Sequence, residues 1–176
     1  MRCVAIGGEP ATGKTTLVSD VFERLDSPKG FKFGLVRGHL NKDLNIALVG
    51  IYGTGGTFLG TDKLAMNVNP HFYKYAEKQN RNIIFEGDRL FTLKNVQMLQ
   101  GLYETRVIVL KAAPEVLHKR HTERGDGQSD KFLQGRKTKI SNIEQGLESA
   151  CEVHYLRNHE DTINLSKDLV SWLSNG

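Results

Sequence analysis

The chain has 176 residues, of which 39% are hydrophobic and 25% charged, and it carries 24 basic against 20 acidic side chains. This length favours one domain, and the composition excludes a disordered or fibrous protein. No apolar run approaches the roughly 20 residues of a membrane-spanning helix. The first residues lead straight into a strand-like run, so we expect no secretory signal, and Cys3 and Cys151 have neither metal-binding nor disulfide spacing. We therefore expect a single cytoplasmic domain, residues 1–176, with no membrane partner.

Hydrophobic periodicity predicts strands that alternate with helices along the chain. In chain order we expect a strand at 2–7, a helix at 14–25, strands at 31–36 and 46–52, a helix capped by Asn69, strands at 82–85 and 105–110, a helix from Pro114, a basic helix at 136–150, a strand at 153–156 and a helix at 163–173. Such alternation is typical of βαβ units. The predicted fold is α/β, a three-layer α/β/α sandwich around a mostly parallel sheet of about five strands.

Positive charge is concentrated in the second half of the chain. From Arg106 to Lys139 there are nine basic and four acidic residues. A local positive excess points to a polyanionic ligand, either the phosphates of a nucleotide or a nucleic-acid backbone. The alternative is a solvent-exposed basic helix face without a ligand.

The sequence Gly8-Glu9-Pro10-Ala11-Thr12-Gly13-Lys14-Thr15 matches the pattern G-x-x-x-x-G-K-[ST] of a phosphate-binding P-loop. It follows a predicted strand and opens a predicted helix, which is the context that phosphate binding requires. Backbone N–H groups and the helix N-terminus would hold the phosphates, Lys14 would reach the β- and γ-phosphates, and the Thr15 hydroxyl would bind Mg²⁺. The predicted nucleotide-binding residues of the loop are Gly8, Ala11, Thr12, Gly13, Lys14, Thr15 and Thr16.

Among P-loop proteins, a small kinase fits best. The segment 41–44 places its Asp one position too early for the base-reading motif of a GTPase, and large ATPase motors need a longer chain. Glu86 ends an apolar strand, where an acid would hold Mg²⁺ together with Thr15. The basic segment 118–139 is the predicted lid, because guanidinium groups bind phosphate oxygens in pairs. Its candidate phosphate ligands are Arg120, Arg124 and Arg136, of which Arg124 is the candidate catalytic arginine.

Two further carboxylates indicate an alcohol as the phosphoryl acceptor. A kinase that acts on a hydroxyl benefits from a carboxylate that takes the proton, whereas a phosphate acceptor needs none. We favour Asp88 as this base and Asp62 as its partner on the substrate side, with Arg89 nearby, although the two carboxylates can exchange roles. Asp62 has an alternative role as the N-cap of the helix that follows.

With these residues assembled, the chain resembles the adenylate-kinase-like P-loop kinases over nearly its full length. Arg157, after the last strand, resembles the loop that contacts adenine in that superfamily. The segments 60–66 (GTDKLAM) and 85–91 (FEGDRLF), together with the GEPATGKTT loop, resemble phage-type kinases that phosphorylate 5-hydroxymethyl pyrimidines in DNA. The resemblance implies ATP and Mg²⁺ as cofactors and modified DNA as substrate, in the host cytoplasm if the protein is phage-encoded.

Two other functions remain open at this point. One is a nucleoside or nucleotide monophosphate kinase with a small-molecule acceptor, and the other is a DNA-binding module whose P-loop is not catalytic. If the acceptor is a base in duplex DNA, it must be extruded, and Tyr52, Phe58 and Phe91 are candidates to stack on it. The alternative for each aromatic ring is a place in the core. The sequence leaves the modified base and the oligomeric state open.

Overall fold

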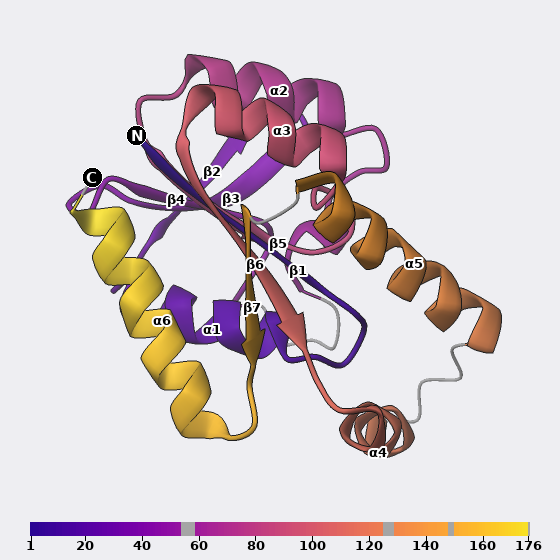
Figure 1. The fold of residues 1–176 in the computed structure, drawn as a ribbon. Coiled ribbons are helices and arrows are strands. Elements are labelled where there is room, and N and C mark those ends of the chain that lie inside the picture. The colour runs from indigo at the N-terminus through magenta and orange to yellow at the C-terminus, as the bar shows by residue number, and fades with distance from the viewer. Residues whose placement is uncertain (54–58, 125–128, 148–149, 176) are drawn as a thin grey trace.

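The computed structural model describes residues 1–53, 59–124, 129–147 and 150–175, without the side chains of residues 123, 124 and 130 (Figure 1). The elements in chain order are β1 (Arg2–Gly8), α1 (Lys14–Arg24), β2 (Lys29–Phe33), β3 (Val36–Asn41), β4 (Ile46–Val49), the 3-10 helix η1 (Thr61–Lys63), α2 (Asn69–Lys78), β5 (Asn82–Glu86), α3 (Leu93–Leu102), β6 (Glu104–Lys111), α4 (Pro114–Arg124), α5 (Asp130–Leu147), β7 (Cys151–Tyr155) and α6 (His159–Ser174). No helix in these described ranges is long and apolar enough to cross a membrane.

The strands form one mixed, mostly parallel sheet with the order β2-β3-β4-β5-β1-β6-β7. The five strands from β4 to β7 in this order run parallel, and β2 and β3 add an antiparallel hairpin to the edge of β4. The predicted α/β fold is therefore confirmed. The sheet has seven strands rather than about five: five of the six predicted segments form its parallel part, and the sixth, at 31–36, lies in the antiparallel hairpin.

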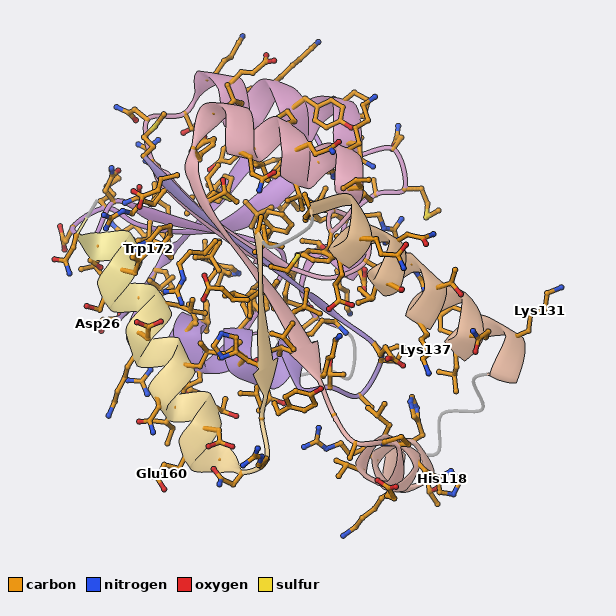
Figure 2. All side chains as sticks on the ribbon, viewed as in Figure 1. Asp26, His118, Lys131, Lys137, Glu160 and Trp172 are labelled. Carbon is orange, nitrogen blue, oxygen red and sulfur yellow. The ribbon has the colours of Figure 1, made fainter. Side chains whose placement is uncertain are left out.

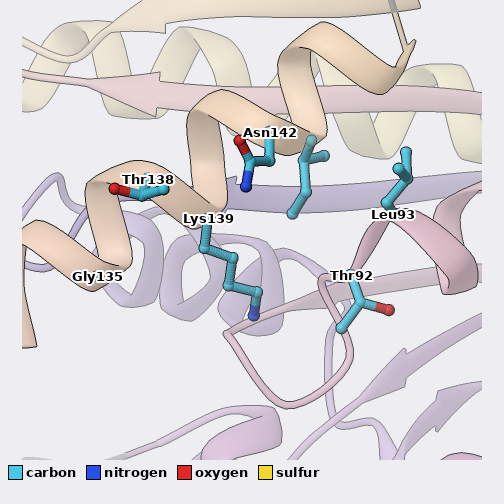
Figure 3. A pocket seen from close by; sticks show the side chains of 7 residues that line it. Thr92, Leu93, Gly135, Thr138, Lys139 and Asn142 are labelled. Carbon is cyan, nitrogen blue, oxygen red and sulfur yellow. The ribbon is translucent and has the colours of Figure 1, made fainter.

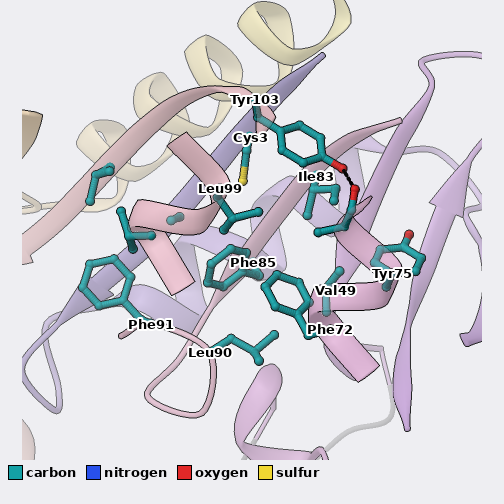
Figure 4. Close-up of a cluster of buried hydrophobic side chains, with 14 of the residues drawn as sticks. Cys3, Val49, Phe72, Tyr75, Ile83, Phe85, Leu90, Phe91, Leu99 and Tyr103 are labelled. Atoms are coloured by element: carbon teal, nitrogen blue, oxygen red, sulfur yellow. Dashed lines mark hydrogen bonds between the residues drawn. The ribbon is translucent and has the colours of Figure 1, made fainter. Parts of the chain in front are cut away.

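Helices cover both faces of this sheet, which gives three layers (Figure 1). Successive side chains of a strand point to opposite faces, and parallel strands are commonly buried on both. Accordingly, Val4 and Ile6 of β1 pack in the layer under α1 and α6, whereas Cys3 and Ala5 pack under α2, α3 and α5. Figure 4 shows the side chains between the sheet and α2, α3 and α5, where Phe72 of α2 packs edge-on against Phe85 of β5.

Two local predictions are wrong. The single strand expected at 31–36 is a hairpin, because Gly34 adopts a left-handed conformation (φ 58°) and pairs Phe33 of β2 with Val36 of β3. Helix α2 has Val68 at its N-cap, so Asn69 already lies inside the helix. The Asn69 side chain instead accepts a hydrogen bond from Asn95 Nδ2 at 2.9 Å.

One helix was not predicted, and two begin earlier than expected, among them α6, which begins at His159 rather than at residue 163. Helix α3 was not predicted; Thr92 caps it by accepting a hydrogen bond from Asn95 N at 3.2 Å. Helix α5 begins at Asp130, six residues before the predicted start, and Ser129 Oγ accepts a hydrogen bond from Phe132 N. The starts of α3 and α5 are set by hydroxyl side chains that satisfy an exposed N–H group of the first turn.

The parallel strands bring the predicted site residues to one edge. In the sheet register Ile6 of β1 pairs with Glu86 of β5, so the loop after β1 and the end of β5 meet at the carboxyl ends of the strands. Helix α4 follows β6 beyond this same edge, and α5 runs from there back over the face of the sheet that α2 and α3 cover (Figure 1). Ligands of open α/β sheets bind at the carboxyl ends of the strands.

Candidate active site

The backbone of the P-loop, residues 8–15, forms a concave turn between β1 and α1. Gly8, Ala11 and Gly13 have positive φ angles of 147°, 63° and 97°. A Cβ on Gly8 would lie 2.4 Å from the Leu110 carbonyl oxygen, so only glycine fits there. Alternating backbone conformations of this kind turn successive N–H groups toward one point, at the N-terminus of a helix of 11 residues. This arrangement fits a phosphate group.

Lys14 lies over this loop. Its Nζ donates hydrogen bonds to the carbonyl oxygens of Gly8 and Glu9, both at 2.9 Å. Thr12 Oγ1 donates to the same Glu9 oxygen at 2.8 Å, which fixes the turn from within. The ammonium group is therefore held beside the backbone that would receive the phosphates.

Thr15 and Glu86 form the second part of the site. Thr15 Oγ1 donates to Glu86 Oε1 at 3.5 Å, and Glu86 is only 2% exposed. Burial raises the pKa of Glu86 to about 7; Lys14 lowers it, and the carboxylates of Asp62 and Asp88 raise it further. No three acidic, histidine or cysteine side chains of the described residues come together to hold a metal, but the Glu86 carboxyl and the Thr15 hydroxyl offer two oxygen ligands for a divalent cation that also binds phosphates. Thr15 and Glu86 would hold Mg²⁺ here.

Tyr52 and Gly60 surround Glu86 and were not predicted as part of the metal site. Tyr52 is 1% exposed. A Cβ on Gly60 would lie 2.1 Å from Glu86 Oε1 and 3.1 Å from the Tyr52 hydroxyl, so the three groups adjoin. Burial and the carboxylates of Glu86 and Asp62 raise the pKa of Tyr52 well above its ordinary value, which keeps the phenol protonated.

The prediction that aromatic side chains stack on an extruded base is wrong for Tyr52 and Phe91. Both are buried in the core, with Phe91 fully covered and packed against the backbone of Gly7. A ring with no exposed face has no surface for a base. Phe58 lies outside the described residues.

The segment around Asp62 is bonded to the end of β5. Thr61 Oγ1 donates to the Glu86 carbonyl at 2.8 Å, and Arg89 N donates to Asp62 Oδ1 at 3.2 Å. The Arg89 guanidinium donates to the Asp62 carbonyl at 3.2 Å. Asp62 is the second residue of η1, whose N-cap is Gly60, so the alternative role of Asp62 as an N-cap is wrong. The carboxylate instead belongs to the same cluster as Glu86 and Asp88.

Asp88 is ion-paired with helix α5. Its Oδ2 lies 3.1 Å from Arg136 Nη1, and its Oδ1 lies 3.5 Å from Lys139 Nζ. Lys139 also donates to the Asp88 carbonyl at 2.8 Å. Arg136, a predicted phosphate ligand, thus faces the proposed base in this structure. The sequence analysis missed Lys139, although its position three residues after Arg136 puts both side chains on one helix face.

A groove of about 370 Å³ opens beside this ion pair (Figure 3). It lies between α5 and the start of α3, and the Lys139 side chain extends from α5 toward the loop before Thr92. Its lining residues are Thr92, Leu93, Gly135, Thr138, Lys139, Asn142 and Ile143. The groove combines apolar walls with hydroxyl and amide groups and is open to solvent.

Of the remaining residues predicted to bind the nucleotide, Arg120 contacts the P-loop directly. Arg120 of α4 donates from Nη1 to the Ala11 carbonyl at 2.9 Å, which brings the basic segment to the loop. A Cβ built on Gly13 would lie 3.7 Å from Leu156, so the residue that precedes Arg157 lies close to the P-loop. Arg157 and Thr16 are exposed. The side chain of the predicted catalytic Arg124 lies outside the described residues.

No known protein family matches the sequence, and no curated protein matches it. Among solved structures, the chain is similar to an uncharacterized protein from Eubacterium ventriosum, with 10% identity, a TM-score of 0.49 and 100% of both chains covered. It is also similar to an unliganded sugar kinase from Janibacter sp. HTCC2649, with 17% identity and a TM-score of 0.49, over 98% of this chain and 94% of that one. The proposals below therefore rest on the residues and geometry of the site.

Proposed function

We propose that this chain is an ATP-dependent phosphotransferase with an alcohol acceptor. The observation that carries the proposal is the contact between Thr15 and Glu86 beside the concave P-loop backbone, because it joins an anion site to a cation site. Residues 8–15 bind the triphosphate, Lys14 stabilises negative charge on the transferred group, and Arg120 contributes from α4. Thr15 and Glu86 would hold Mg²⁺, which neutralises phosphate charge when bound.

The transfer itself needs few protein groups. The acceptor hydroxyl oxygen forms a bond to the γ-phosphorus, the bond from that phosphorus to the β–γ bridging oxygen breaks, and ADP leaves. Asp88 takes the hydroxyl proton, and Asp62 orients the acceptor. For Asp88 to accept a proton, its ion pairs with Arg136 and Lys139 have to loosen. Arg136 is then released to bind the phosphates from α5.

The acceptor that we propose is the hydroxymethyl group of a 5-hydroxymethyl pyrimidine in DNA. The two segments that carry the resemblance to phage-type DNA kinases, 60–66 and 85–91, are hydrogen-bonded to each other at the site. Exposed cationic side chains on α4 and α5 offer contacts for a DNA backbone, among them Lys131 and Lys137 (Figure 2). The groove beside Lys139 would receive the base.

One observation favours a second candidate, a nucleoside monophosphate kinase. The Arg89 guanidinium lies at the site, where it contacts the backbone carbonyl of Asp62. An arginine in this place can bind an acceptor phosphate through paired hydrogen bonds. The two functions differ only in the acceptor, so one assay separates them.

The test is transfer of label from γ-labelled ATP to four acceptors: duplex DNA with 5-hydroxymethyluracil, the same duplex with thymine, free 5-hydroxymethyldeoxyuridine, and a panel of nucleoside monophosphates. We expect label on the modified duplex alone. If only the monophosphates or only the free nucleoside become labelled, that compound and not DNA is the acceptor. No label on any acceptor, with DNA binding unchanged in Lys14→Ala, would favour a non-catalytic DNA-binding module.

A further inference from the structure

The Tyr52 hydroxyl is buried beside the Glu86 carboxylate, which raises the pKa of the phenol. Its side chain is 1% exposed, and no described residue offers its hydroxyl a hydrogen bond of normal length and angle. Buried polar groups in folded proteins are nearly always hydrogen-bonded, because an unpaired one destabilises the fold. A tyrosine at this position therefore calls for an explanation other than folding.

Core packing does not require the hydroxyl. The Tyr52 ring stacks near Phe22, with centroids 6.3 Å apart, and meets His39 edge-on at 6.3 Å. The backbone N–H of Tyr52 donates to His39 Nε2 at 3.3 Å. A phenylalanine would keep the ring contacts and the backbone hydrogen bond. The hydroxyl is the only part of the side chain that these contacts leave unexplained.

The backbone fixes the hydroxyl beside the metal-holding carboxylate. The backbones of Ile51 and Gly60 exchange two hydrogen bonds, of 3.1 and 2.9 Å. These bonds hold Gly60 next to the residue that precedes Tyr52. Gly60 in turn lies so close to Glu86 that a Cβ would be 2.1 Å from Oε1 and 3.1 Å from the Tyr52 hydroxyl. Gly60 has a φ of 79°, which disfavours any larger residue. Because Gly60 has no side chain, the Tyr52 hydroxyl and Glu86 Oε1 both border the space that a Cβ would fill, and the carboxylate raises the pKa of the phenol.

We propose that Tyr52 is a positioning residue for the metal site, whose hydroxyl donates to Glu86 and orients this carboxylate toward a cation held with Thr15. The inference rests on the proposed function. Groups that hydrogen-bond a metal ligand fix its orientation, and their loss commonly weakens metal binding 10- to 100-fold. In the metal-free protein the hydroxyl lacks a hydrogen bond of normal geometry, which lowers the stability of the fold. A phenylalanine at this position would avoid that loss of stability.

The experiment compares wild type with Tyr52→Phe by two measurements. Binding of Mn²⁺ in the presence of ADP is followed by electron paramagnetic resonance, and ADP binding without divalent cations is measured by calorimetry. We expect about tenfold weaker Mn²⁺ binding and unchanged ADP binding in EDTA. We also expect the metal-free variant to melt at the same or a higher temperature than wild type, because it no longer buries a hydroxyl that lacks a hydrogen bond of normal geometry.

Tyr103→Phe is the matched control. Tyr103 is also buried, at 4% exposed, but its hydroxyl donates to the Ala76 carbonyl at 2.7 Å in the layer of α2 (Figure 4). We expect a lower melting temperature and unchanged Mn²⁺ binding for this control. Unchanged Mn²⁺ binding in Tyr52→Phe would overturn the inference and leave the proposed function intact. Failure of wild type to bind Mn²⁺ with ADP would overturn both.

Discussion

Thr15 and Glu86 are 71 positions apart in the sequence, yet their side-chain oxygens lie 3.5 Å apart. The sheet brings them together, because β1 and β5 are parallel neighbours and Ile6 pairs with Glu86. The P-loop then returns the chain to the same edge at Thr15, in the first turn of α1. A phosphate site and a cation site thus share one border, which is the requirement for handling a nucleoside triphosphate.

Replacement of Lys14 by alanine should abolish phosphoryl transfer without unfolding the protein. The Lys14 ammonium donates to the carbonyl oxygens of Gly8 and Glu9 and lowers the pKa of Glu86, so we expect its contribution to be charge at the phosphates rather than packing. Loss of such a group typically lowers turnover 10²- to 10³-fold. Label transfer and circular dichroism measure the two effects. Wild-type turnover in this variant would show that Lys14 takes no part in phosphoryl transfer.

Glu86 should make the stability of the metal-free protein depend on pH. Its pKa rises from 4.5 to about 7 on folding, so the native state binds the proton more tightly than the unfolded chain. Stability is therefore lost as the pH rises from 4.5 to 7, and the full loss, on the order of 3 kcal/mol, is present above pH 7. Glu86→Gln should be more stable than wild type by this amount at pH 8, and the gap should close near pH 4.5. Urea unfolding in EDTA measures both, and a gap that does not change with pH would contradict the buried carboxyl group.

Gly60→Ala should destabilise the protein and disturb the metal site together. The new methyl group would overlap Glu86 Oε1, at 2.1 Å, and the backbone angles of 79° and −150° are open almost only to glycine. We expect a loss of ~3 kcal/mol in the free energy of unfolding. Gly101→Ala in α3 is the control, since a Cβ there meets nothing within 4 Å; it should gain about 0.5 kcal/mol. Equal effects of the two variants on unfolding would be inconsistent with close packing at Gly60.

Asp88→Asn should lower turnover far more than ATP affinity, by roughly 10²-fold or more, if Asp88 serves the acceptor. The same change breaks the ion pairs with Arg136 and Lys139, so hydrogen exchange in α5 should increase. Lys139→Gln separates the two roles, because it loosens α5 but keeps the carboxylate. We expect faster exchange in both variants, with the smaller increase in Lys139→Gln because it keeps the ion pair with Arg136, and a much smaller loss of turnover in Lys139→Gln. Equal losses of turnover in Asp88→Asn and Lys139→Gln would show that Asp88 only holds α5 in place and does not act on the acceptor.

The sequence alone predicts the central layer and the P-loop because both depend on local patterns. Apolar runs of 4 to 6 residues mark the buried strands, and the spacing from Gly8 to Thr15 specifies the loop without reference to the rest of the fold. The placement of Glu86 followed from its position at the end of such a run. These features need only neighbours in sequence.

The parts that were missed depend on contacts between distant segments. The hairpin of β2 and β3 follows from one left-handed glycine, Gly34, inside an apparently continuous strand. The core position of Tyr52 and its hydroxyl beside Glu86 are set by the approach of Gly60, which no local pattern reveals. Lys139 carried a signal, its spacing from Arg136 on the helix, but its contact with Asp88 lies across 51 residues.

The most direct test of the central claim is a crystal structure with Mg²⁺ and a non-hydrolysable ATP analogue. We predict the β- and γ-phosphates among the backbone N–H groups of residues 8–15, with the metal ion next to Thr15 and Glu86. A triphosphate bound elsewhere on the protein, with this loop free of phosphate, would contradict this prediction.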